Sequence, residues 1–162
     1  MNVEELEAAN RRSSLHSSSA DSRLRAFYRR LIERNREAGS PLRICELVPF
    51  RALLETSARL SLEHFARRST SATPFQILSF ESDGSFGTFC PELLGTDAPR
   101  FANFRFGRVP EDAIDAIVDR AEFRAALAEI EQGRERCRAE CGYWRFCGGG
   151  QPANKWFETG RL

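Results

Sequence analysis

The stretch CRAECGYWRFCGGGQPANKWFETGRL, residues 137–162, is the most informative part of this sequence. Its cysteines Cys137, Cys141 and Cys147 are spaced C-x3-C-x5-C, and three adjacent glycines follow the last of them. Cys137 and Cys141 share one face if they lie on a helix, and a bend after them would bring Cys147 to the same centre. Clustered thiols of this kind are ligands for iron–sulfur clusters and for zinc. The spacing therefore predicts a metal centre in this segment.

Two kinds of metal centre compete for these thiols. Glycines after Cys147 would let backbone amides approach cluster sulfurs closely, an arrangement that tunes iron–sulfur centres. Zinc usually takes four ligands and often uses histidine, but His16 and His64 are far away in the sequence. A four-ligand zinc site would therefore need Cys90 or Cys45. The glycine and aromatic setting favours an iron–sulfur cluster, and zinc stays open as the alternative.

Composition limits the class of protein. The 162 residues carry 24 basic and 23 acidic side chains, so the formal charge of +1 provides no field that would attract a nucleic acid. No apolar run is long enough to span a membrane, and the first residues lack the pattern of a signal peptide. We therefore expect a cytoplasmic chain that binds neither nucleic acid nor membrane. Thiols in a reducing cytosol bind metal more often than they form disulfides.

The first half of the chain is expected to be helical. Residues 1–20 are rich in serine and are expected to form a flexible leader, whereas residues 21–74 form a helical segment. The first helix would be capped by Asp21 or Ser22 and end at Gly39. A second amphipathic helix is expected over residues 47–65. Apolar faces left exposed on these helices would need a partner.

The second half changes character at Pro74. Residues 75–80 and 85–90 are short aromatic segments separated by a turn that contains Asp-Gly, which predicts a β-hairpin. Residues 101–106 are expected to add a third strand or an extended loop. A helix then begins after Pro110 and ends at Gly133. The expected fold class is α+β: N-terminal helices, a central β-hairpin, a helical connection and a cysteine-rich C-terminal segment.

Two blocks of this sequence resemble one known family. Residues 141–160, CGYWRFCGGGQPANKWFETG, are similar to the C-terminal SPASM-type segment of radical S-adenosylmethionine (radical SAM) peptide maturases, which install cyclophane crosslinks in ribosomally made peptides. Residues 82–95, SDGSFGTFCPELLG, resemble a block that lies upstream of the cysteines in that family. The resemblance covers residues 75–162, which would form a SPASM-like iron–sulfur domain. Residues 21–74 would then be a linker or the end of a barrel that is missing here.

The resemblance implies a role for each matched position. Cys137, Cys141 and Cys147 would ligate an auxiliary 4Fe–4S cluster. The family continues to a further cysteine, so the fourth iron would need Cys90, a carboxylate, a substrate group or water. Cys90 stands where the family has serine, and it is either a replacement ligand or part of a packed turn. The residues that would shape the surroundings of the cluster or contact substrate are Gly148, Gly149, Gly150, Pro152, Asn154, Lys155 and Glu158. For Asn154 and Glu158 the plain alternative is one turn of helix, and for Lys155 it is a solvated charge.

The sequence lacks the motif that carries out the first step of the family's reaction. A C-x3-C-x2-C loop, which holds the cluster that cleaves S-adenosylmethionine, does not occur in the chain. Cofactor cleavage would therefore belong to a separate radical SAM barrel protein, with a precursor peptide as the other partner. We expect an auxiliary cluster module of a split or truncated peptide-modifying enzyme, and whether the chain itself is an enzyme stays open. The alternatives are a non-enzymatic zinc- or partner-binding module and a non-functional gene remnant.

Overall fold

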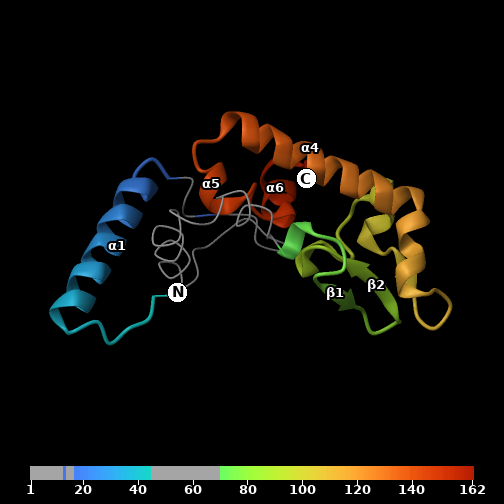
Figure 1. Ribbon diagram of the computed structural model, residues 1–162, viewed down its shortest axis with the longest axis horizontal. Coiled ribbons are helices and arrows are strands. Elements are labelled where there is room, and N and C mark those ends of the chain that lie inside the picture. The colour runs from blue at the N-terminus through green and yellow to red at the C-terminus, as the bar shows by residue number, and fades with distance from the viewer. Residues whose placement is uncertain (1–12, 14–16, 45–69) are drawn as a thin grey trace, which may run out of the picture. The chain divides into compact units, whose positions relative to one another are not determined.

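The computed structural model describes residue 13, residues 17–44 and residues 70–162 (Figure 1). The chain divides into two compact units, and the described residues up to 44 and from 70 onward belong to different ones. The helix expected over residues 47–65 lies outside the described residues, as does most of the expected leader. Among the residues that are described, no helix combines the length and the apolar character needed to cross a membrane.

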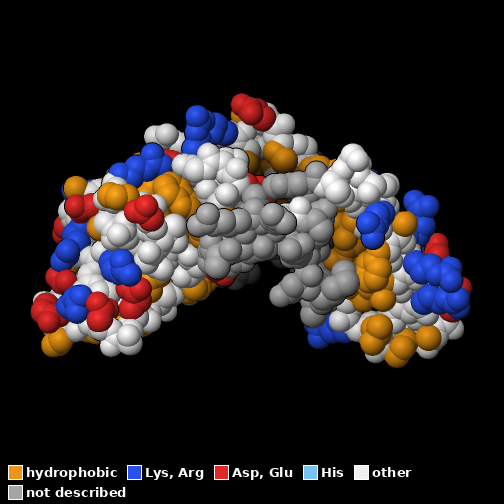
Figure 2. All heavy atoms as spheres, turned by 180° about the vertical axis from the view of Figure 1, so that it is seen from behind, with side chains coloured by type: hydrophobic (Ala, Val, Ile, Leu, Met, Phe, Trp, Pro, Cys, Tyr) orange, Lys and Arg blue, Asp and Glu red, His pale blue; other side chains and the backbone are white. Residues whose placement is uncertain are grey.

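Helix α1 (Ala20–Glu37) confirms the first expected helix. The expected caps are wrong, because the helix begins after Ser19 and Ser22 Oγ donates a hydrogen bond back to the carbonyl of Ser19 at 3.0 Å. The helix ends where predicted, just before Gly39, whose φ of +80° is left-handed. Figure 2 shows hydrophobic side chains beside Lys and Arg side chains on this helix, and Phe27 is 44% exposed.

A three-stranded antiparallel sheet lies in the second unit, in the order β1-β2-β3. It is built from β1 (Leu78–Phe80), β2 (Ser85–Thr88) and β3 (Gly107–Arg108). The hairpin between β1 and β2 confirms the prediction, although both strands are shorter than expected. Its turn uses Gly84 in a left-handed conformation with a φ of +86°.

The third strand does not lie where the sequence placed it. Residues 99–104 form the 3-10 helix η4 (Pro99–Phe104), and the strand follows it. Asn103 has a left-handed φ of +54°, and its side-chain oxygen accepts a hydrogen bond from the Ala98 amide at 2.9 Å. Asparagine tolerates this conformation and supports turns through such bonds, which explains why the segment coils.

The helix expected from Pro110 to Gly133 is wrong at both ends. Two helices replace it, the 3-10 helix η5 (Ile114–Asp119) and the long helix α4 (Ala121–Glu140), with Arg120 extended between them at ψ 136°. Gly133 therefore lies inside α4 rather than at its end. On η5 only Ile117 is buried, whereas Ile114 and Val118 are 37% and 39% exposed.

The core of the second unit consists mainly of phenylalanine. Phe123 of α4 stacks on Phe89 with ring centres 5.7 Å apart and meets Phe106 edge to face at 5.5 Å. Helix α6 (Pro152–Thr159) joins this core through Trp156, whose ring lies 5.9 Å from that of Phe104. Figure 1 shows the sheet near the first half of α4, and α6 beside the second half with the short helix α5 (Trp144–Cys147). The chain is thus α+β, as predicted. The fully buried large side chains are Phe86, Phe89, Phe101, Phe104, Phe106, Leu93, Ile117, Ile130 and Leu162.

Candidate metal centre

The end of α4 brings two of the predicted thiols together. Cys137 lies in the last turn, and the Cys141 amide donates to the Cys137 carbonyl at 2.9 Å, so the two cysteines are one helical turn apart. Both line one pocket of about 500 Å³. The expectation that these two cysteines share a face is therefore confirmed. Both cysteine residues are partly exposed.

The third thiol lies outside this pocket. Cys147 ends α5 and is exposed, and it is not among the residues that line the pocket. Within the described residues, no three Cys, His, Asp or Glu side chains lie close enough to hold a metal ion. In this conformation two of the predicted cysteine ligands line one pocket, and a third ligand requires Cys147 to move towards Cys137.

The glycines after Cys147 form a left-handed turn. Gly148, Gly149 and Gly150 have φ values of +63°, +103° and +71°. Residues that carry a side chain rarely adopt these backbone conformations. The amides of Gly148 and Gly150 donate to the carbonyls of Trp144 and Cys147, at 2.9 and 3.3 Å, rather than to sulfur. The Cys137 sulfur lies 4.0 Å from the carbonyl oxygen of Gly149, so the turn passes next to the first thiol.

Cys90 lies in a packed turn away from the thiol pocket. It is 2% exposed, and its sulfur accepts a hydrogen bond from the Ala153 amide at 3.4 Å and lies 3.7 Å from the Ser71 carbonyl oxygen. Cys90 therefore ties the loop after β2 to the first turn of α6. In this structure the sulfur of Cys90 therefore contributes to packing.

The residues of α6 that were predicted to surround the cluster differ in their burial and in whether they line the thiol pocket. Pro152 is buried at the start of the helix, and Asn154 is half-buried. Lys155 is half-buried and lines the thiol pocket, whereas Glu158 is exposed and does not. Lys155 is therefore the one residue of this predicted α6 set that the structure brings to the two thiols.

Sequence reasoning missed the contact that closes this pocket. A Cβ atom added at Gly133 would lie 2.1 Å from the backbone oxygen of Leu162 and 3.4 Å from Lys155 Nζ. The backbone of Leu162 therefore lies directly against α4, and only glycine permits this approach. The signal in the sequence was a glycine inside a helical pattern, which is as typical of close packing as of a helix end.

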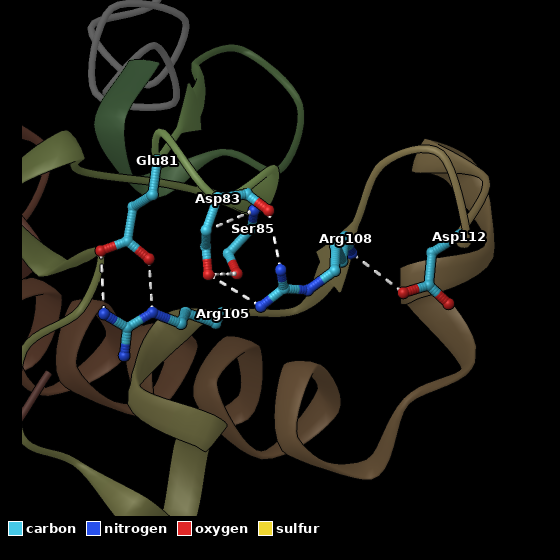
Figure 3. A network of polar contacts seen from close by, with 6 residues as sticks. All are labelled: Glu81, Asp83, Ser85, Arg105, Arg108 and Asp112. Carbon is cyan, nitrogen blue, oxygen red and sulfur yellow. Dashed lines mark hydrogen bonds and ion pairs between the residues drawn. The ribbon is translucent and has the colours of Figure 1, made fainter.

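A polar network holds the hairpin and its turn, and it was also missed (Figure 3). Arg105 forms a two-point ion pair with Glu81, and this pairing lowers the pKa of the Glu81 carboxyl and raises that of the guanidinium. The amide and hydroxyl of Ser85 donate to Asp83, which lowers the pKa of Asp83. Arg108 also donates to Asp83, at 2.7 Å. None of these residues lines the thiol pocket, so their role is to fix the hairpin.

The chain has a relative among known proteins. The chain is 33% identical over 159 residues to a protein of Synechocystis sp. (strain ATCC 27184 / PCC 6803 / Kazusa) that carries the name "Uncharacterized protein sll1766". The match covers 98% of this chain and 38% of the relative, so the chain spans well under half of the relative's length. No protein-family model matches the chain. No solved structure matches it either.

Proposed function

We propose that residues 75–162 form an auxiliary iron–sulfur module of SPASM type, which serves a radical SAM barrel in modifying a ribosomally made peptide. The observation that carries the proposal is the pocket at the end of α4, which both Cys137 and Cys141 line. Cys147 follows one short helix later and is the third ligand. A 4Fe–4S cluster held there would supply one-electron redox chemistry.

Closing the site requires Cys147 to turn towards the pocket, and the cysteine is exposed at the end of a short helix. Helix α5 has four residues, and Tyr143, which precedes it, is 68% exposed. The glycine turn that follows already passes beside Cys137. Because the free energy of metal ligation is coupled to local folding, it is large enough to reorient one helical turn.

The charges around the pocket suit thiolate ligands. Arg136, Lys155 and Arg161 line it together with the two cysteines, and Glu140 is the acidic side chain among the lining residues. Cationic side chains offset the negative charge of thiolate ligands and of the cluster that such ligands hold.

The length of the relative supports a module that works beside another domain. It matches nearly all of this chain but is more than twice as long, which leaves room for at least one further domain of ordinary size. We propose that S-adenosylmethionine is bound by a barrel outside this chain, since the chain contains no C-x3-C-x2-C loop.

Reconstitution with iron and sulfide under anaerobic conditions tests the proposal. The parent protein is expected to bind both, and Cys137→Ala, Cys141→Ala and Cys147→Ala are each expected to lower the iron content strongly. Cys90→Ala is the matched control and is expected to retain the iron, because Cys90 packs elsewhere. A colourless protein that carries zinc through the same cysteines would instead establish the structural zinc site.

A further inference from the structure

A groove rich in basic side chains runs along one face of α4. The thiol pocket and a second hollow of about 370 Å³ share Arg136 and Arg161 as lining residues, so the two adjoin. Arg100 lines the second hollow, and Lys155 lines the first. These four residues, Arg100, Arg136, Lys155 and Arg161, define what is called the basic groove below.

The close contact at Gly133 creates the groove. Residues 160–162 lie on α4 because Gly133 has no side chain, and Leu162 is anchored there with its side chain 1% exposed. The Leu162 amide also donates to Glu129 Oε1 at 3.2 Å. This anchoring places Arg161 beside Arg136 of the helix, so two segments that are distant in the sequence line one surface.

The groove carries a net positive charge, because its four basic side chains outnumber the acidic ones that line it, Glu129 and Glu140. Arg100 is paired with Glu129 at 2.9 Å. Among residues 17–44 and 70–162, by contrast, the side chains of Arg136, Lys155 and Arg161 have no ion-pair partner. Exposed arginines elsewhere in this unit do have partners, as Arg124 has Asp119 at 2.5 Å. Three unpaired cations along one groove make a local positive field that favours an anionic ligand.

We propose that the basic groove binds an acidic segment of the peptide substrate through its Asp and Glu side chains. The proposal rests on the proposed function, from which it takes the substrate to be a peptide. Guanidinium groups match carboxylates with paired, charge-assisted hydrogen bonds, and Arg136 and Arg161 are both exposed and available for them. The groove adjoins the thiols, so a bound segment lies next to the proposed cluster.

A single-stranded nucleic acid fits the groove less well. Glu129 and Glu140 lie in its walls and would repel a continuous line of phosphates. The ring of Trp156 is covered by the Arg100 guanidinium, 5.3 Å from the ring centre, and is not presented for stacking on a base. Separate carboxylates spaced along a peptide avoid the two acids.

Fluorescence anisotropy on the full chain, purified without metal and with reduced thiols, tests the proposal. The probes are a short fluorescein-labelled peptide rich in Glu and its counterpart with Gln at the same positions. The Glu peptide is expected to bind more tightly, with an affinity that falls as salt is raised. Arg136→Glu combined with Arg161→Glu is expected to weaken binding about tenfold or more, which corresponds to the loss of charge-assisted bonds.

The control is Arg138→Glu, on the same helix but outside the groove. Arg138 is two residues beyond Arg136 and therefore on a different face, and its side chain is 53% exposed. It is expected to bind the Glu peptide like the parent. Arg136→Gln, which removes a charge without adding one, gives a milder loss if the double variant does not fold.

Three results would overturn the proposal: equal affinity for the Glu and Gln peptides, an equal loss in Arg138→Glu, or displacement of the peptide by a single-stranded RNA at lower concentration. Because the binding assay needs no metal, its outcome is independent of the proposed cluster. The iron content of the reconstituted parent is measured separately, so that a failure of the groove is distinguished from a failure of the metal centre.

Discussion

Replacing Gly133 by alanine tests the packing on which both the thiol pocket and the basic groove depend. Gly133 lies inside α4, where alanine is ordinarily preferred by about 1 kcal/mol. The added Cβ, however, would lie 2.1 Å from the backbone oxygen of Leu162, far inside van der Waals contact. The clashing atom belongs to the backbone, so residues 160–162 must move away from the helix.

The cost of that movement follows from what Leu162 loses. Its side chain is 1% exposed, and exposing a buried leucine costs roughly 1.5–3 kcal/mol. The hydrogen bond from its amide to Glu129 contributes about 1 kcal/mol more. After the gain in helix propensity is subtracted, Gly133→Ala is expected to lower the free energy of unfolding by about 2 kcal/mol.

Urea unfolding followed by far-ultraviolet circular dichroism measures this difference. Gly142→Ala is the matched control, because a Cβ at Gly142 would meet no atom within 4 Å. It is expected to leave the unfolding midpoint unchanged or slightly higher. If Gly133→Ala were as stable as the parent or more stable, residues 160–162 would not lie against α4, and the groove would not exist as described.

Two further predictions concern the hairpin. Thr88→Val keeps the shape of a buried side chain but removes its hydroxyl, which accepts a hydrogen bond from the Phe75 amide at 2.8 Å and donates one to the Ile77 carbonyl at 2.9 Å. Chemical denaturation should show that the free energy of unfolding falls by about 2 kcal/mol. Thr88→Ser keeps the hydroxyl and should lose less. Arg105 lowers the pKa of Glu81 in the folded state, so the stability from this pair is present above the ordinary glutamate pKa of about 4.3 and is lost as pH falls through the lowered value. Denaturation of the parent and Glu81→Gln over a pH series should therefore show a stability difference that shrinks on acidification, and a difference independent of pH would contradict this.

Local chemistry allowed part of this fold to be predicted. The apolar spacing of α1 and the left-handed Gly84 of the hairpin turn are properties of neighbouring residues, and both were predicted correctly. Residues 101–106 look like a strand by composition, but the side chain of Asn103 bonds to the Ala98 amide and coils the chain. Gly133 was read as a helix end, because the segment that packs on it is far away in sequence. Tertiary contacts override local preference at both places.

In the candidate site, too, local spacing could be predicted and tertiary contacts could not. Cys137 and Cys141 are one helical turn apart, so their common pocket followed from periodicity alone. The position of Cys147 depends on the conformation of the glycine turn, which spacing does not determine. The basic groove joins Arg100, Arg136 and Arg161, and only the folded chain brings these residues together.

The most direct test of the central claim, that Cys137, Cys141 and Cys147 hold an iron–sulfur cluster, is Mössbauer spectroscopy of the protein reconstituted anaerobically with iron-57 and sulfide. The parent is expected to show the spectrum of a 4Fe–4S cluster, and Cys147→Ala is expected to lose it. A parent spectrum that contains only mononuclear iron, unchanged when Cys147 is replaced, would contradict the claim.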